Sequence, residues 1–250
     1  MDVGVHIKRD SALLLLRFNR ADKKNAITQT MYLALAEALE AANRDDGIGV
    51  CVILGSPRIF TAGNDIGDFL RAGADGEGIG AVLRFLHALA SLDRPLLAAL
   101  DGLAVGIGAT LLLHCDYVLA TPRSVLRTPF TALGLVPEAG SSLLGPRIMG
   151  HARAFDLLVM GEDFGAEAAL TAGIVNAIVP EDRLEAAILE RAHMLAAKPR
   201  DAVLAARRLL KGDPAEILAR MAEEAELFVQ RLASAEAKAA FAAFLTTGPR

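Results

Sequence analysis

A long apolar stretch in the middle of the chain, residues 95–120, constrains the fold more than any other segment. Leu96 to Leu100 is apolar at every position, as expected of a strand buried on both faces. Polar residues and glycines interrupt the rest: Asp101, Gly102, Gly106, Gly108, His114 and Asp116. Because a membrane-spanning helix needs about 20 predominantly apolar residues, the stretch predicts instead a buried strand, a glycine turn, a helix and a second strand.

Segments with strand and helix patterns alternate along most of the chain. Val3 to Lys8 and Ala12 to Phe18 open it as a pair of strands, and Val50 to Leu54 is a short buried strand. Between them lies a helical pattern in which Thr28 is the expected N-cap. This alternation predicts an α/β fold. The composition becomes strongly helical near residue 198, so we expect an α/β core over residues 1–197 and a helical region over residues 198–250.

The composition argues against several classes of function. The formal net charge of −4 gives no overall basic field to attract nucleic acid or anionic lipid. Cys51 and Cys115 both lie in apolar runs and form no CxxC pair, which is typical of two reduced thiols in an intracellular protein. The first ten residues are polar and charged, unlike a signal peptide. We therefore expect a cytoplasmic protein that binds neither nucleic acid nor membrane.

The glycine turn after the strand at Leu96 is suited to binding a negatively charged group. Without side chains, the turn lets a ligand approach the backbone closely. The helix that follows presents free N–H groups and a partial positive charge. Such a site suits a phosphate or a developing oxyanion. A dinucleotide-binding motif fits poorly because Leu111 stands at its third glycine position, whereas glycines that serve only tight packing are an open alternative.

A second turn of small residues, Ile59 to Asp65, follows the strand at Val50. It too can expose a backbone N–H. Two such turns after two buried strands can direct two donors at one carbonyl oxygen, which is the arrangement of an oxyanion hole.

Three segments together resemble the enoyl-CoA hydratase/isomerase (crotonase) family. Ile59 to Asp65 resembles its turn Phe-Ser/Ala-Ala-Gly-x-Asp, and Asp101 to Asp116 resembles its Gly-x-x-x-Gly-Gly-Gly followed by Cys-Asp. Asn19 to Ile27 resembles its opening Asn-Arg-Pro-x-x-x-Asn-Ala. Residues 128–150, 171–179 and 235–245 match in order and spacing, so the resemblance covers essentially the whole chain.

The resemblance implies a crotonase-like spiral of β-β-α units, a C-terminal helical region used for trimerisation, and homotrimers or hexamers. It implies an acyl-CoA thioester substrate, with no metal and no cofactor apart from the coenzyme A of the substrate. The oxyanion donors that it implies are the backbone N–H groups of Ala62 and Ile107. The implied substrate and coenzyme A contacts are Lys24, Asn25, Ala26, Ala62, Gly63, Asn64, Asp65, Ile66, Gly106, Ile107 and Phe130.

The carboxylates indicate which reaction of the family to expect. Hydratases of the family use two glutamates, but the corresponding positions hold Thr110 and Phe130, which cannot do acid–base chemistry at neutral pH. Glu138 remains, in a Pro-Glu-x-x-Ser-Ser pattern that resembles the Δ3,Δ2-enoyl-CoA isomerase branch. That reaction requires one base, which removes the α-proton of a 3-enoyl thioester and returns it to the γ-carbon. Pro137 is expected to open a helix at its first position, where the dipole favours an acidic residue for structural reasons alone.

Three functions stay open at this stage. The first is isomerisation with Glu138 as the base. The second is hydration or another crotonase-type reaction that uses Glu138 alone, and the third is acyl-CoA binding without catalysis. Phe69, Phe130 and the helical segment Ile79 to Leu92 are candidates for an acyl pocket, and residues 73–78 are expected to form a mobile loop.

Overall fold

The computed structural model describes residues 3–68 and 78–247. Phe69 and the predicted mobile loop lie outside these ranges, except for Gly78, the first residue of helix α3 (Gly78–Ala90). Residue 198 falls between helix α7 (Leu184–Ala196) and helix α8 (Arg200–Lys211), and the domain boundary there stays a prediction.

The larger sheet has six strands in the order β1-β2-β3-β5-β7-β10. Its strands are β1 (Val5–Asp10), β2 (Leu13–Phe18), β3 (Val50–Leu54), β5 (Leu96–Leu100), β7 (Tyr117–Ala120) and β10 (Ala177–Ile178). Only β1 runs antiparallel to its neighbour, so the predicted N-terminal strand pair is confirmed. β3 and β5 have the predicted bounds and are buried at every residue, because helices cover both faces of this part of the sheet.

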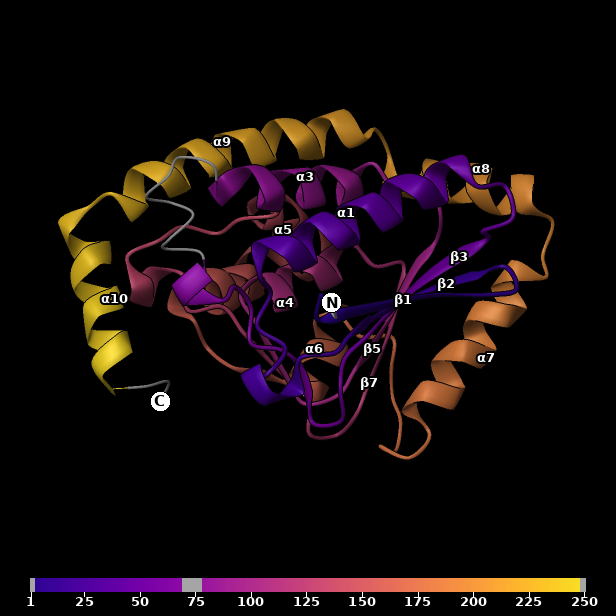
Figure 1. Ribbon diagram of the computed structural model, residues 1–250, viewed down its shortest axis with the longest axis horizontal. Coiled ribbons are helices and arrows are strands. Elements are labelled where there is room, and N and C mark those ends of the chain that lie inside the picture. Colours follow the sequence, from indigo (N-terminus) through magenta and orange to yellow (C-terminus); the bar gives the residue numbers. More distant parts are fainter. Residues whose placement is uncertain (1–2, 69–77, 248–250) are drawn as a thin grey trace.

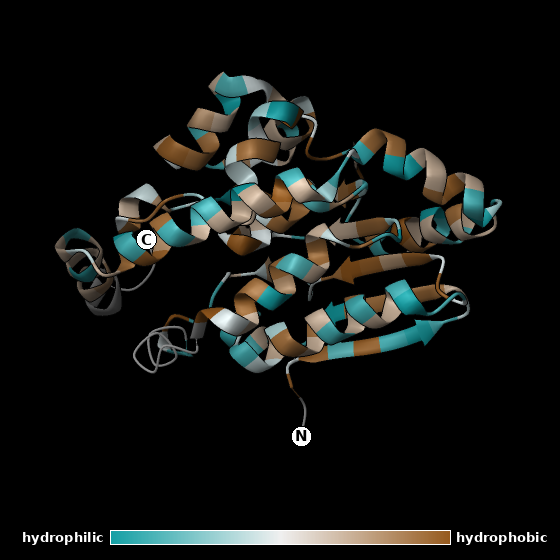
Figure 2. Ribbon diagram, turned by 90° about the horizontal axis from the view of Figure 1, so that it is seen from above, coloured by the Kyte–Doolittle hydropathy of each residue, from teal (hydrophilic) through white to brown (hydrophobic). Residues whose placement is uncertain are grey.

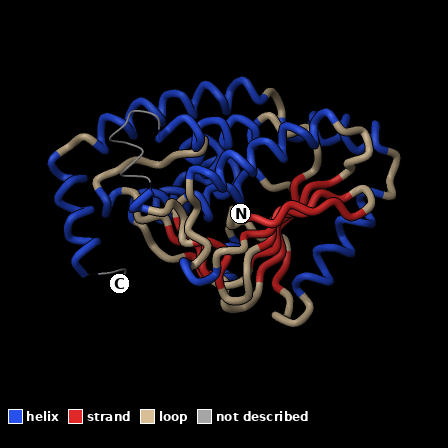
Figure 3. The backbone as a smooth tube through the Cα atoms, viewed as in Figure 1, coloured by secondary structure: helices blue, strands red, loops and turns tan. Residues whose placement is uncertain are grey.

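A smaller sheet has the strand order β4-β6-β8-β9. Its strands are β4 (Ile59–Thr61), β6 (Leu103–Val105), β8 (Val125–Arg127) and β9 (Phe164–Gly165). Each pass of the chain gives one strand to the larger sheet and the next to the smaller: β3 then β4, β5 then β6, β7 then β8 (Figure 3). The expected spiral of β-β-α units is therefore confirmed. β6 was not predicted, because three residues are too few to show a strand periodicity.

Helices pack on the two faces of the larger sheet. α1 (Gln29–Arg44) begins after the predicted cap, where the Thr28 hydroxyl accepts the Met31 N–H at 3.3 Å. α1 packs against α3, and α9 (Pro214–Leu232) lies along α3 (Figure 1). On the other face, α7 buries Leu184, Ile188 and Ala192 against β3 and β5. The helices show alternating hydrophilic and hydrophobic stripes in Figure 2, as expected of elements with one buried face.

Further helices follow strands along the chain, and the last of them follows α9. They are α4 (Ile107–Thr110), α5 (Ser141–Phe155), α6 (Ala166–Thr171) and α10 (Ala235–Thr247). Gly150, predicted to end a helix, has φ 78° and breaks the helical path within α5. Along residues 3–68 and 78–247, no helix combines the length and apolar character needed to span a bilayer. Cys51 and Cys115 are both free thiols, as predicted.

The predicted helix start at Pro137 is wrong. α5 begins at Ser141, because Ala139 (φ 61°) and Gly140 (φ 70°) both adopt the left-handed conformation and interrupt any helix there. Glu138 consequently lies in a loop before the helix and not in its first turn.

Candidate active site

Two turns meet at the carboxyl ends of β4 and β6. These strands are parallel neighbours in the smaller sheet, so the turns that follow them share one edge. A Cβ at Gly63 would lie 2.7 Å from the Val105 carbonyl oxygen, and one at Gly108 would lie 2.5 Å from Thr61 Cγ2. A side chain at either position would push the turns apart, so glycine is required for their close approach.

The Ala62 N–H, predicted as an oxyanion donor, is already engaged. It donates to the Lys24 carbonyl at 2.9 Å, because the preceding loop runs beside the turn, and the Asp65 N–H donates to the Ile27 carbonyl at 2.9 Å. The prediction for Ala62 is therefore wrong. The Asn64 N–H, which lies between these two donors in the chain, has no acceptor in the described part of the protein.

The other predicted donor, the Ile107 N–H, is free of any acceptor among the described residues. Ile107 is the first residue of α4, where a helix leaves its N–H groups without internal partners. A Cβ at Gly63 would lie 3.9 Å from the Gly106 nitrogen, so the residues that follow these two glycines are neighbours. The contact between the turns thus carries two unengaged donors, Asn64 and Ile107.

Glu138 faces this region from the loop before α5. Its Oε1 accepts a hydrogen bond from the Thr110 hydroxyl at 2.6 Å. Burial among apolar side chains raises the pKa of Glu138 to about 8, the Thr110 hydrogen bond opposes that rise, and the charge of Glu224 adds to it. A carboxyl group whose pKa lies near neutrality is suited to accept and release a proton at physiological pH.

Glu224 caps the N-terminus of α5 and was not predicted from the sequence. This α9 residue is 4% exposed. Its carboxylate accepts the Gly140 N–H at 2.6 Å, the Ser142 N–H at 2.9 Å and the Ser142 hydroxyl at 2.5 Å. Glu224 therefore fixes the end of the loop that carries Glu138. Its partners lie more than 80 residues away in the sequence, so no local motif marks it.

Tyr32 is a second site residue that was not predicted. It is fully buried on α1, and its hydroxyl donates to Asn64 Oδ1 at 2.5 Å. Burial raises the pKa of the Tyr32 phenol well above its usual range, and the nearby charge of Glu138 raises it further. The phenol therefore stays protonated and fixes the Asn64 side chain as a hydrogen-bond acceptor.

A pocket of about 470 Å³, including its open mouth, lies between α3 and α9. It is lined by Asn64, Ile79, Val82, Leu83, Leu86, Glu138, Ala139, Met221, Glu224, Ala225 and Phe228. Of these lining residues only Asn64, Glu138 and Glu224 are polar. The pocket thus has apolar walls with Glu138 among them, which suits an apolar chain carried by a polar reactive group. The α3 segment lines it as predicted.

A comparison of the sequence with models of protein families agrees with this fold and its two turns. The family model described as enoyl-CoA hydratase/isomerase matches residues 8–249. The chain belongs to the enoyl-CoA hydratase/isomerase family.

Relatives of this chain include isomerases and hydratases. Enoyl-CoA delta isomerase 2 of Rattus norvegicus is 32% identical over 99% of this chain, which spans only 64% of that relative, less than two thirds. The 2,3-dehydroadipyl-CoA hydratase of Escherichia coli (strain K12) is 31% identical, with 96% of this chain and 94% of the relative covered. A crystal structure of an enoyl-CoA hydratase/isomerase from Pseudoalteromonas atlantica T6c is similar with a TM-score of 0.93 and 39% identity over 99% of both chains.

The three residues near position 24 that were predicted to contact coenzyme A differ in their exposure. Asn25 is fully buried, and its amide donates to the carbonyls of Ile59 (3.1 Å) and Phe60 (3.0 Å). It therefore holds the loop against the turn after β4 and is not accessible to a ligand. Lys24 is exposed and Ala26 is half-buried, so both are accessible, and their contact with coenzyme A stays a prediction.

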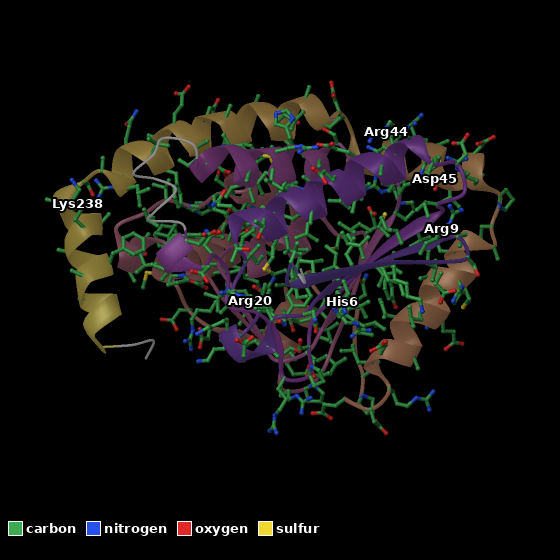
Figure 4. The ribbon with its side chains drawn as sticks, viewed as in Figure 1. His6, Arg9, Arg20, Arg44, Asp45 and Lys238 are labelled. Carbon is green, nitrogen blue, oxygen red and sulfur yellow. The ribbon has the colours of Figure 1, made fainter. Side chains whose placement is uncertain are left out.

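Asp65, the last residue of the turn, is engaged within the protein. Arg20, labelled in Figure 4, donates to Asp65 Oδ2 at 2.7 Å and to the Ala26 carbonyl at 2.9 Å. This ion pair ties the loop to the turn. The Ile66 side chain is partly buried against the main core. The contacts of Asp65 and Ile66 are thus made within the protein, and their contact with a ligand stays a prediction.

Phe130 and His114 belong to the interior. Phe130 is 5% exposed and is not among the residues that line the pocket, so its predicted substrate contact is not supported there. His114 is buried, with its Nε2 2.7 Å from the Ala139 carbonyl, and burial lowers its pKa to about 4. It is a neutral structural histidine, as expected. Within the described ranges, no three His, Cys, Asp or Glu side chains form a metal-binding group.

Proposed function

We propose that this protein isomerises 3-enoyl-CoA thioesters to 2-enoyl-CoA thioesters, with Glu138 as the base. The observation that carries the proposal is a single carboxyl group with a pKa near neutrality beside two unengaged backbone donors. Ionised Glu138 takes the α-proton, and the electron pair moves into a dienolate. The same carboxylic acid then delivers that proton to the γ-carbon. The reaction moves one proton and requires no redox group.

The dienolate oxygen is proposed to accept from the N–H groups of Asn64 and Ile107. An oxyanion hole of this kind stabilises the charge that develops in the transition state, and losing one donor typically costs about a hundredfold or more in rate. Asn64 takes the role first assigned to Ala62, because the Asn64 N–H has no acceptor among the described residues whereas the Ala62 N–H donates to the Lys24 carbonyl. The CoA thioester is supported as the substrate by the family to which the chain belongs.

Hydration is the main competing reaction, because a hydratase relative aligns along nearly its whole length. That chemistry uses two acid–base groups. Beside Glu138, the other carboxylate among the residues that line the pocket is Glu224, and three donors already occupy it. Thr110 and Phe130 supply no further acid. These observations favour isomerisation.

The test is to supply 3-enoyl-CoA and 2-enoyl-CoA in parallel and to follow the absorbance of the conjugated thioester. We expect conjugation to increase from the 3-enoyl substrate with the wild type and to be lost with Glu138→Gln. Calorimetric titration with a saturated acyl-CoA serves as the binding control and should give similar affinities for both proteins. Rapid loss of conjugation from the 2-enoyl substrate would establish hydration instead, and binding without turnover of either would leave an acyl-CoA-binding role.

A further inference from the structure

Thr110 lies between the base and one of the two backbone donors. It is 1% exposed and sits three residues after Ile107 on α4. Its hydroxyl oxygen lies 2.6 Å from Glu138 Oε1 and 3.3 Å from the Gly106 carbonyl oxygen. A hydroxyl carries one proton and can donate fully to only one of these acceptors at a time. The shorter distance makes the Glu138 carboxylate the preferred one.

The alternative acceptor is part of the proposed oxyanion hole. The Gly106 carbonyl and the Ile107 N–H are the two ends of the same peptide group. Each hydrogen bond accepted by a peptide carbonyl polarises that peptide and strengthens its N–H as a donor. The Gly106 carbonyl already accepts the N–H groups of Ala109 at 2.9 Å and Thr110 at 3.0 Å, and the Thr110 hydroxyl is positioned to add to them.

We propose that Thr110 is a positioning residue that holds the ionised Glu138 carboxylate in place and turns its hydroxyl toward the Gly106 carbonyl once Glu138 has taken the substrate proton. This inference rests on the proposed isomerase function. The proton of Thr110 stays on its own oxygen throughout. The substrate proton moves from the α-carbon to Glu138 and then to the γ-carbon, so the Ile107 donor is strengthened while the dienolate oxygen carries its charge.

Two other titratable groups face Glu138. They are the Glu224 carboxylate from α9, whose charge raises the pKa of Glu138, and the buried Tyr32 phenol from α1. Neither is hydrogen-bonded to the Glu138 side chain, and Thr110 is its only hydrogen-bond donor in the described part of the chain. A change at Thr110 therefore alters one interaction of the base and leaves both titratable neighbours in place.

The experiment compares Thr110→Val, which keeps the side-chain shape without the hydroxyl, with Thr110→Ser, which keeps the hydroxyl. Glutamate labelled with ¹³C at the side-chain carboxyl is titrated by NMR, and Glu138→Gln identifies the Glu138 resonance. Because a hydrogen bond donated to a carboxylate lowers its pKa, we expect the Val variant to titrate about one pH unit higher and the Ser variant to match the wild type.

Kinetics give a second readout. At pH 7 we expect kcat of Thr110→Val to fall about tenfold with KM nearly unchanged, the acid limb of its pH profile to move higher, and Thr110→Ser to recover most of the rate. If the Val variant does not fold, Thr110→Ala carries the same test.

An unmoved Glu138 titration in an otherwise active enzyme would overturn the inference about Thr110 alone. A Ser variant as impaired as the Val variant would overturn it as well. A shifted titration in a protein whose wild type does not isomerise 3-enoyl-CoA would overturn the proposed function and leave the contact between Thr110 and Glu138 supported.

Discussion

Replacing Glu138 by Gln should make the protein more stable at neutral pH while it abolishes turnover. In the folded protein the pKa of Glu138 is raised from an ordinary value of 4.5 to about 8, mainly by burial. At pH 7 the unfolded chain carries this carboxyl ionised, whereas the folded chain holds it mostly protonated, with a minor ionised fraction that can act as the base. Folding must therefore take up a proton, and the stability of the wild type falls as the pH rises from 4.5 through 8.

The magnitude follows from the distance between the two pKa values. Holding a carboxyl protonated costs about 1.4 kcal/mol for each pH unit above its unfolded pKa, which gives about 3.5 kcal/mol at pH 7. Water reaches part of the half-buried side chain and screens the effect, so we expect about 2 kcal/mol. A glutamine stays neutral and can still accept the Thr110 hydrogen bond. For a chain of this size the gain corresponds to an increase in Tm of roughly 4 to 8 °C.

The assay is urea unfolding of the wild type and Glu138→Gln at pH 5, 7 and 8.5. We expect the difference in unfolding free energy to be small at pH 5 and to increase toward pH 8.5. Glu190→Gln, the same change at an exposed position of α7, is the matched control and should show no such increase. A Glu138→Gln variant that is no more stable than the wild type at pH 7, or whose advantage is independent of pH, would refute the reasoning.

Three further substitutions test the supports of the site. Glu224→Gln should destabilise the fold by about 2 to 3 kcal/mol in urea melts, since an amide has one acceptor oxygen where the carboxylate has two. The same variant should shift the acid limb of the kcat profile to lower pH, because a charge that raises the pKa of Glu138 is removed. Asn25→Ala should cost about 2 to 4 kcal/mol of unfolding free energy in urea melts, because it leaves several buried backbone groups without partners. Gly63→Ala should reduce kcat/KM about a hundredfold, because its Cβ would lie 2.7 Å from the Val105 carbonyl oxygen at φ 83°; an enzyme with wild-type turnover would contradict the close approach of the turns.

Local patterns in the sequence were sufficient to locate the strands of the large sheet and the glycine turns, but not the order of those strands. The apolar runs of β3 and β5 were predicted with their observed bounds, because buried parallel strands consist of apolar residues without interruption. Thr28 was correctly predicted as a helix cap, because a threonine directly before a helical apolar pattern is a local signal of a helix start. The crotonase spiral itself was inferred from resemblance, since no periodicity specifies how the strands divide between two sheets.

Features that depend on distant partners were missed. The pairing of the turn after β4 with the loop at Lys24 decides which of its N–H groups is left without an acceptor. The sequence favoured the Ala62 N–H, but in the described part of the chain the Asn64 N–H is the one without an acceptor. The helix does not begin at Pro137 as predicted, because Ala139 adopts a positive φ. Alanine rarely takes this conformation, so the sequence does not predict it. The homotrimer or hexamer, the cytoplasmic location and the coenzyme A contacts stay predictions.

The spiral has a consequence for how the chemistry of such a site can diversify. Asn64, Ile107 and Glu138 follow strands of three successive turns of the chain, β4, β6 and β8. Removing the carboxyl group from one turn and placing one on another would change where a proton is delivered, whereas both donors are backbone N–H groups that do not depend on which side chain carries the carboxyl group. The intermediate and the product are thus specified by separate parts of the sequence. We expect a chain of this kind to change its site of protonation through such replacements while it keeps the two donors that stabilise the common intermediate.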